Sequence, residues 1–259
     1  MAEFKKDISE QLKHVESFRL ESPKSQYETA RLKGDKTTII LYTTGRYQIQ
    51  GSLEKAKVAV AHLKKAKHDF TIVGSDEVLK GDSFGGIVVA AVRANPKERD
   101  ELEGFVPGDS KKLSDNKIID IAMKIMEKYK YSVQEIYPKD YNKLVENKGL
   151  THVLNELHEK CNNELKTNDS KHIVDKFPGC KAGDIMEERA DENYIEVMAA
   201  SLIARYVGLL QISTLSKMAG FKLPLGSTHV EEALKEMKKR KLDLSEFAKT
   251  GFNNVKKFV

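Results

Sequence analysis

The sequence predicts an α/β protein in which a small α+β domain precedes a larger mixed sheet flanked by helices. Two observations predict this class. Residues 1–66 have the pattern helix, three strands, helix, and the remaining residues alternate strands with helices. The charge also changes along the chain, since residues 1–66 hold 13 Lys and Arg against 8 Asp and Glu, whereas residues 67–259 hold 31 of each. We therefore expect two domains, 1–66 and 67–259.

The first domain combines helical and strand patterns. Apolar residues recur with a helical period over 2–18, and a second helix is expected over 53–65. Between them, β-branched and aromatic residues predict strands at 27–32, 37–43 and 46–50. An antiparallel sheet that is covered by helices on one face leaves its other face open.

Strand alternation places Arg46, Gln48 and Gln50 together on that open face. These long side chains form hydrogen bonds and suit a sugar-phosphate backbone. Together with the local basic excess they point to nucleic acid as the partner. The alternative is a sheet face that is merely solvated.

The second domain alternates strands with helices, which is typical of a mixed sheet with helices on both faces. Short apolar runs predict strands at 70–73, 87–92, 131–136 and 171–174. Helical periods predict helices at 115–129, 141–146, 150–165, 197–218 and 230–240, and a short terminal helix after residue 242. Residues 95–108 are charged and contain two prolines, so we expect a loop there, and Pro138 marks a turn.

Acidic residues follow the first of these strands. Asp76 and Glu77 come just after it, in a glycine-rich stretch, and desolvated carboxylates need a cation or hydrogen bonds. Asp175 follows another strand, and Asp191 precedes a helix. Because sites in such sheets collect at strand ends, three or four carboxylates could meet there, as a divalent metal site requires. The alternative is an acidic loop whose carboxylates lie in water.

Cysteine content and hydropathy restrict the cellular setting. Two cysteines, Cys161 and Cys180, do not make a disulfide framework, so a reducing, cytosolic setting is the default. No uninterrupted apolar run approaches the roughly 18–20 residues of a membrane helix, and the first residues lack the apolar core of a signal peptide. We expect a cytoplasmic protein that does not enter a membrane.

Four segments resemble, in order, the motifs of the type 2 and type 3 ribonucleases H. They are Gly74–Ala91, Asp109–Ser114, His172–Phe177 and Arg189–Arg205. Two further segments resemble the type 3 branch: Thr38–Gly51 is similar to its N-terminal domain, which resembles half of a TATA-binding protein, and Gly220–Val230 is similar to its loop after the long helix. The resemblance covers nearly the whole chain.

This resemblance implies a ribonuclease H-like sheet and an endonuclease that hydrolyses the RNA strand of RNA–DNA hybrids. It implies Mg²⁺ or Mn²⁺, a two-metal-ion mechanism, and products with 5′-phosphate and 3′-hydroxyl ends. Carried over by motif, the catalytic metal ligands are Asp76, Glu77, Asp175 and Asp191, with Glu192 as a rival for the fourth position. The substrate-binding residues expected are Tyr42, Arg46, Gln48, Gln50, Lys80, Gly81, Ser110 and Lys111. We expect a monomer.

Backbone geometry adds two expectations for the first motif. Neighbouring residues of a strand point to opposite faces, so the strand should end or bulge at Asp76 and Glu77 if both are to reach the metals. The family has Gly, a variable residue and Gly where this chain has Leu79, Lys80 and Gly81. Two glycines let the backbone approach ribose 2′-hydroxyls, so we expect Leu79 to change how the substrate is held.

Other departures and alternatives remain open. Gly86 stands where Pro is usual in the family. One alternative is a nucleic-acid-binding protein of the same fold with weakened or lost cleavage, and another is a different metal-dependent phosphotransfer enzyme. A zinc site from His152, His158, Cys161 and Cys180 is a third alternative, but the CxxC spacing of such sites is absent.

Overall fold

The computed structural model describes residues 18–42, 47–52, 69–106 and 113–259. The chain divides into two compact units, Met1–Asp69 and Phe70–Val259. The expected boundary after residue 66 and the expected helix over 53–65 lie outside the described residues. Of the helix expected over 2–18, only residue 18 is described.

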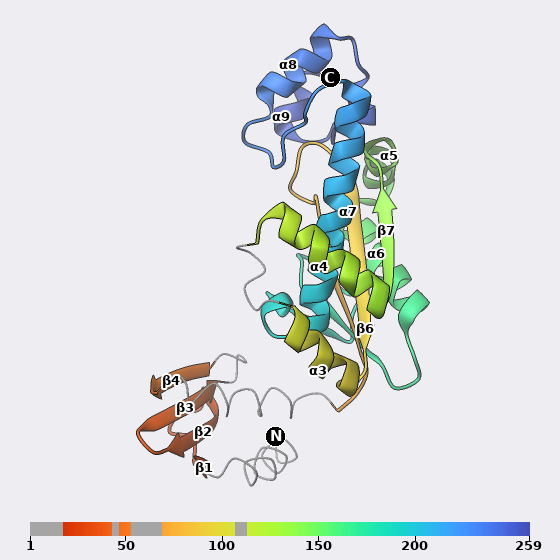
Figure 1. Ribbon diagram of the computed structural model, residues 1–259. Helices are drawn as coiled ribbons and strands as arrows, with labels where there is room; N and C mark the ends of the chain where they lie inside the picture. Colours follow the sequence, from red (N-terminus) through yellow and green to blue (C-terminus); the bar gives the residue numbers. More distant parts are fainter. Residues whose placement is uncertain (1–17, 43–46, 53–68, 107–112) are drawn as a thin grey trace. The chain divides into compact units, whose positions relative to one another are not determined.

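The first unit contains a four-stranded antiparallel sheet in chain order (Figure 1). Its strands are β1 (Phe18–Glu21), β2 (Glu28–Gly34), β3 (Thr37–Tyr42) and β4 (Tyr47–Gly51). Strands β2, β3 and β4 were predicted from the sequence, whereas β1 was not. Leu32 lies opposite Ile39, which lies opposite Ile49, and these residues form an apolar face. Gln48 and Gln50 alternate with Ile49 and are exposed on the other face.

The second unit is built on a five-stranded mixed sheet in the order β7-β6-β5-β8-β9. The strands are β5 (Ile72–Val78), β6 (Ile87–Ala94), β7 (Lys130–Ile136), β8 (Lys171–Asp175) and β9 (Ile185–Glu187). The first three pair antiparallel, whereas β8 lies parallel to β5 and β9 parallel to β8. The predicted mixed sheet is confirmed, although the short edge strand β9 was not expected.

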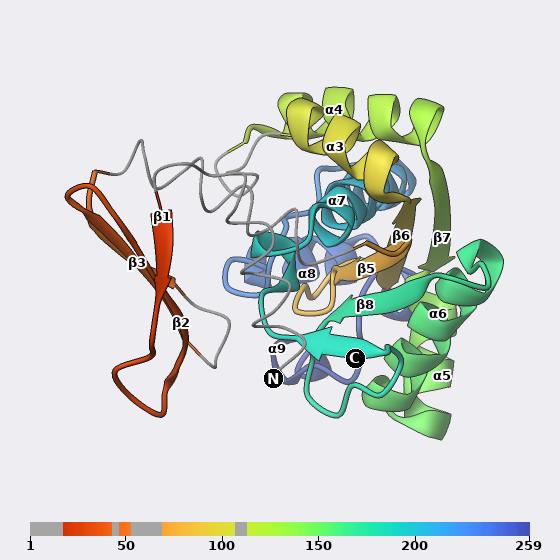
Figure 2. The same ribbon diagram turned by 90° about the horizontal axis from the view of Figure 1, so that it is seen from below.

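Helices cover both faces of this sheet (Figure 2). One face carries α3 (Pro96–Phe105), α4 (Asp115–Lys128) and α7 (Ile195–Ala219), and the other carries α5 (Pro138–Lys148) and α6 (Leu150–Leu165). Each face is a separate apolar core, so β5 and β6 are buried on both sides. The C-terminal part adds α8 (Glu231–Lys239), η4 (Leu244–Glu246) and α9 (Asn253–Lys256).

Two expectations based on proline were wrong. Residues 96–105 form a helix and not a loop, because Asn95 caps it by accepting from the Glu98 backbone N–H while the Glu98 side chain accepts from the Asn95 N–H. Pro96 and Pro138 each occupy the first turn of a helix, where the missing N–H costs no hydrogen bond. Asn95, Pro96 and Glu98 form a capping signal that is visible in the sequence. The prediction of a loop relied instead on the charge and the prolines of the segment.

The long helix α7 corrects the expectation that no segment is long and apolar enough to cross a membrane. By length and composition it could cross a membrane, since its most apolar window has a mean hydropathy of 1.5. However, 61% of that window is buried inside the fold, where it packs against β5 and β6. We therefore assign α7 as the core helix of the second unit.

Candidate active site

The acidic pair lies inside β5, near its C-terminal end. Asp76 pairs opposite Ala90 and Glu77 opposite Val89 in an unbroken antiparallel register. The strand therefore neither ends nor bulges at the pair, and that expectation was wrong. The pairing with β8 stops at Ser75, opposite Val174, so beyond this point β5 has no strand on that side among the described residues.

Regular alternation sends the two carboxylates to opposite faces of the sheet. Asp76 faces α7, where the Ser201 side chain forms a hydrogen bond with it. Glu77 faces α6, where its Oε2 lies 3.3 Å from His158 Nε2. The open edge of β5 is thus the place where acidic groups from both faces come near each other.

Asp76 is buried among other negative groups. Burial, together with the charges of Glu77 and Asp175, raises the pKa of its carboxyl to about 8. The Glu77 backbone N–H donates to Asp76 Oδ1 at 2.8 Å, which favours the ionised form but does not outweigh burial. A cation at this place would stabilise the carboxylate that burial disfavours.

Asp175 and Asp191 come from segments that meet beside Asp76. Asp175 ends β8, and the Ala190 N–H donates to its Oδ1 at 2.9 Å. Asp191 lies in the short 3-10 helix η3 (Ala190–Glu192) just before α7 and is 7% exposed. Burial and the charges of Asp191 and Glu77 raise the pKa of Asp175. Glu192, the rival for the fourth position, has a side chain that is 43% exposed and paired with Arg189.

Glu77 has two cationic or potentially cationic neighbours. Burial opposes its charge, but the nearby His158 and Lys80 outweigh burial and leave the pKa of Glu77 lowered. The Lys80 ammonium donates to Glu77 Oε1, while Oε2 faces His158. Glu77 is therefore held as a carboxylate on the α6 side of the sheet.

Together these acids fit a hard divalent cation by their chemistry. Carboxylate oxygens are the ligands that Mg²⁺ and Mn²⁺ prefer, and the mutual repulsion of the acids is what a cation would relieve. Within the described ranges, no three His, Cys, Asp or Glu side chains already converge as a metal site. The alternative zinc set is not assembled, and Cys161 and Cys180 are free and buried.

Leu79, the residue that departs from the family pattern, has a backbone that would suit glycine. Its φ is 66°, in the left-handed region that costs an L-residue roughly 1–2 kcal/mol. Its side chain is 3% exposed and belongs to the core that contains α7, packed close to Gly85 and Gly208. The substitution thus adds core packing while the turn conformation is retained.

Gly86, the second departure, lies against the backbone of β7. A Cβ atom there would come within 2.0 Å of the Ile136 carbonyl oxygen. Its N–H donates to the buried Gln211 Oε1 at 2.7 Å. This backbone position therefore has no room for the family's proline and uses the N–H that proline lacks.

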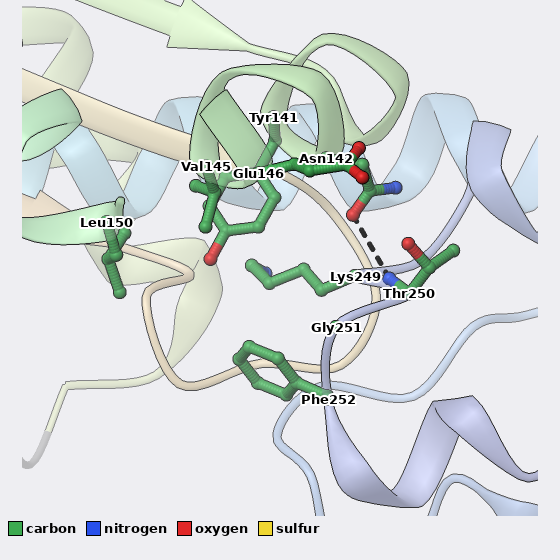
Figure 3. Close-up of a pocket in the computed structure, with 9 residues that line it drawn as sticks. All are labelled: Tyr141, Asn142, Val145, Glu146, Leu150, Lys249, Thr250, Gly251 and Phe252. Carbon is green, nitrogen blue, oxygen red and sulfur yellow. Dashed lines mark hydrogen bonds between the residues drawn. The ribbon is translucent and has the colours of Figure 1, made fainter. Parts of the chain in front are cut away.

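The loop between Gly81 and Gly86 is held by the C-terminal segment. The buried Lys249 ammonium donates to the carbonyl oxygens of Asp82 at 2.6 Å and Gly85 at 2.9 Å. Figure 3 shows its side chain extending between the rings of Tyr141 and Phe252, whose centroids lie 5.1 and 5.5 Å from Nζ. Burial lowers the pKa of Lys249 to about 7.

This buried lysine predicts a pH-dependent stability. Between about pH 7 and pH 10 the unfolded chain keeps a proton on Lys249 that the folded chain loses, so the unfolding free energy rises with pH. We expect a contribution of up to about 1.4 kcal/mol per pH unit in that window, absent in Lys249→Met. Urea unfolding at pH 7, 8 and 9 measures the difference between the two proteins. Lys256→Met, at an exposed position of α9, serves as the control; equal slopes for wild type and Lys249→Met would contradict the assignment.

The expected substrate-binding residues fall into three groups. Lys80 and Gly81 lie beside the acids, and the Cβ position of Gly81 opens into free space. Tyr42 and Gln48 share a hydrogen bond of 2.9 Å in the first unit, where Gln50 is exposed on the same face as Gln48. Arg46, Ser110 and Lys111 lie outside the described residues.

From the sequence, His158 entered only the alternative zinc set, and His172 and Ser75 were given no role of their own. Hydrogen bonds join these three residues to one another, and His158 Nε2 lies within ion-pair distance of Glu77. Strand alternation offered one signal, because it places Ser75 on the same face as Glu77. Nothing local in the sequence indicates that His158 of α6 reaches this face.

The chain is similar to known proteins in sequence and in structure. A family model described as ribonuclease HII matches residues 73–255. The ribonuclease HIII of Phytoplasma mali is 34% identical and covers 87% of this chain and 85% of its own length. The ribonuclease HIII of Streptococcus pneumoniae is 29% identical, with 86% and 83% covered.

Solved structures agree with these relatives. The crystal structure of Bst-RNase HIII in complex with Mn²⁺ superposes with a TM-score of 0.71 at 25% identity, over 95% of this chain and 92% of that one. The Aquifex aeolicus RNase H3 structure has a TM-score of 0.60 at 28% identity and covers 98% of each chain. The predicted fold class and the resemblance stated from the motifs are both confirmed.

Proposed function

The chain belongs to the ribonuclease HII family, on its type 3 side, and we propose that it cleaves the RNA strand of RNA–DNA hybrids with Asp76, Glu77, Asp175 and Asp191 as metal ligands. It is a ribonuclease H and thus a hydrolase. Hydrolysis by the two-metal route of this family leaves 5′-phosphate and 3′-hydroxyl ends. The observation that carries the ligand assignment is the burial of Asp76 beside Asp175, at an edge of β5 that Asp191 also borders.

The cofactor is a divalent metal ion, Mg²⁺ or Mn²⁺. When bound, such an ion stabilises charge on the phosphate and lowers the pKa of a coordinated water. The chain's own contribution is a dense set of carboxylates, two of which have raised pKa values in the absence of a cation. Burial of Asp191 and exposure of Glu192 favour Asp191 as the fourth ligand.

We assign recognition of RNA to the turn formed by Leu79, Lys80 and Gly81. Leu79 keeps the left-handed backbone while its side chain packs inward, so the backbone of the turn stays accessible. At Gly81 no heavy atom of the described residues lies within 4 Å of a Cβ position, which leaves room for a ribose to approach the main chain. The 2′-hydroxyl is the group that distinguishes RNA from DNA.

Gly81→Ala tests this assignment. Because its Cβ would meet no atom of the described ranges within 4 Å, we expect the unfolding free energy to change by less than about 1 kcal/mol. Cleavage should fall by about tenfold to a hundredfold, mostly through KM, because a close backbone contact with ribose is lost. Steady-state kinetics on a hybrid and urea unfolding measure the two effects. Full activity of the variant would remove Gly81 from substrate binding.

The first unit contributes binding and not chemistry in this proposal. Tyr42, Gln48 and Gln50 lie on one face of the sheet, and their hydrogen-bonding groups suit contacts to a sugar-phosphate backbone. Arg46, Ser110 and Lys111 complete the proposed contacts by motif. We further propose that the protein acts in the cytoplasm as a monomer.

The experiment that tests the function uses labelled RNA–DNA hybrid, duplex DNA and duplex RNA. Each is incubated with the full chain in Mg²⁺, in Mn²⁺ and in chelator. We expect metal-dependent cuts in the RNA strand of the hybrid alone. Binding of the hybrid without any cut would overturn the enzyme assignment in favour of a binding protein, and cleavage of duplex DNA would indicate a different phosphotransfer enzyme.

A further inference from the structure

A buried chain of hydrogen bonds leads to His158, which faces Glu77 from the α6 side of the sheet. His172 Nε2 lies 2.8 Å from Ser75 Oγ, and Ser75 Oγ lies 2.8 Å from His158 Nδ1. His158 Nε2 then faces Glu77 Oε2 at 3.3 Å. Ser75 and His158 are 0% exposed and His172 is 2% exposed, so bulk water does not reach these side chains.

Elementary hydrogen-bond chemistry gives this chain a direction. His172 Nδ1 lies 2.7 Å from the Ala182 carbonyl oxygen, which only accepts, so the hydrogen is on Nδ1. Burial lowers the pKa of His172 to about 4, so the ring is neutral and its Nε2 accepts from the Ser75 hydroxyl. Ser75 Oγ in turn accepts from His158 Nδ1, so Nε2 is the atom of His158 that faces Glu77, and it has a hydrogen to donate only when the ring is an imidazolium.

The end of the chain at Glu77 is not a completed structural contact. His158 Nε2 and Glu77 Oε2 are within ion-pair distance, but both are buried atoms without a hydrogen bond of good geometry. Buried polar groups are costly when they are not fully paired. A carboxylate has about four lone-pair sites, so the approaches of His158 and Lys80 leave sites on Glu77 for a cation.

We propose that His158 is a positioning residue for the Glu77 carboxylate, with Ser75 and His172 fixing the orientation of its ring. This inference rests on the proposed role of Glu77 as a metal ligand. His158 and Lys80 approach different oxygens of Glu77, so together they fix the carboxylate plane. Outer-shell groups that orient metal ligands typically change metal affinity by about tenfold to a hundredfold when they are removed.

The test measures Mn²⁺ affinity of the full chain without substrate, by electron paramagnetic resonance of the free ion. We expect His158→Leu to weaken Mn²⁺ binding by about tenfold to a hundredfold and His158→Gln, which keeps a donor, to recover part of the loss. His152→Leu is the matched control, because His152 pairs with Glu156 on the exposed side of the same helix at 3.1 Å. Unchanged affinity in His158→Leu, or equal loss in His152→Leu, would overturn the proposal.

A second measurement does not depend on any variant. Nitrogen-15 NMR of the metal-free wild type should show His172 as the neutral ring with hydrogen on Nδ1. The opposite tautomer would break the direction of the chain and overturn the role of His172 and Ser75.

Glu77→Gln separates this proposal from the proposed function. If Glu77→Gln weakens Mn²⁺ binding and His158→Leu does not, Glu77 remains a ligand and His158 loses its role. If Glu77→Gln leaves Mn²⁺ binding unchanged, the ligand assignment of Glu77 fails and the positioning role fails with it.

Discussion

Asp76→Asn is expected to lower metal-dependent cleavage of an RNA–DNA hybrid by about a thousandfold or more. Metal-ion catalysis contributes several kcal/mol of transition-state stabilisation, and about 1.4 kcal/mol corresponds to each factor of ten in rate. Asp76 is buried on the α7 face and has two acidic neighbours. An amide in its place cannot supply the negative charge that a divalent ion needs.

Stability should respond differently from activity. Because the pKa of Asp76 is raised to about 8, its carboxyl is largely neutral at pH 7 without metal, and asparagine resembles that neutral form. We therefore expect the metal-free variant to unfold within about 1 kcal/mol of wild type. Added Mn²⁺ should stabilise wild type and not the variant.

The control for this pair of measurements is Asp120→Asn, at an exposed position of α4. It should leave cleavage, unfolding and the stabilisation by Mn²⁺ unchanged. Cleavage by Asp76→Asn at the wild-type rate would show that the site lies elsewhere. If Asp76→Asn loses activity because the protein is unfolded, Asp76 has a structural role and not a ligand role.

Gly86→Pro is expected to destabilise the fold by about 3–5 kcal/mol, although proline is the usual residue of the family at this position. Two costs combine. The added carbon atoms would enter the space of the Ile136 carbonyl, where a Cβ already comes within 2.0 Å. Proline also removes the N–H that the buried Gln211 Oε1 accepts, and an unsatisfied buried acceptor costs roughly 1–3 kcal/mol.

Urea unfolding of three variants separates these costs. Gly86→Ala keeps the N–H and should show the steric part alone. Gly104→Ala is the matched control, since its Cβ would meet no atom within 4 Å in helix α3, and alanine should stabilise that helix by roughly 0.5–1 kcal/mol. Wild-type stability in Gly86→Pro would mean that the backbone of this loop differs from the one described.

The two departures from the family pattern have different consequences. Leu79 keeps a left-handed backbone and adds buried apolar surface, so the turn that precedes Gly81 retains its shape. Gly86 allows the loop to approach Ile136 more closely than any side chain permits. Both residues help to place the loop that follows the acidic pair. The ammonium of Lys249 holds the far end of this loop.

Much of the second unit could be predicted from local pattern. The helix over 150–165 has the expected bounds, because its apolar residues repeat with a helical period along its whole length. Helix α3 was missed because its charge concealed a capping box, although Asn95, Pro96 and Glu98 encode it locally. The edge strand β9 was missed because three residues carry too little pattern to identify a strand.

By itself the sequence determined the family, the order of the four acidic motifs and the class of chemistry, because these depend on residue types at set spacings. Only the tertiary structure decided which face of the sheet each acid occupies. The length of β5 depends on its hydrogen bonds with β6, and the open edge beyond Ser75 depends on where β8 ends. The approach of His158 to Glu77 likewise arises from packing α6 on the sheet, and contacts between residues this far apart in the chain leave no local pattern.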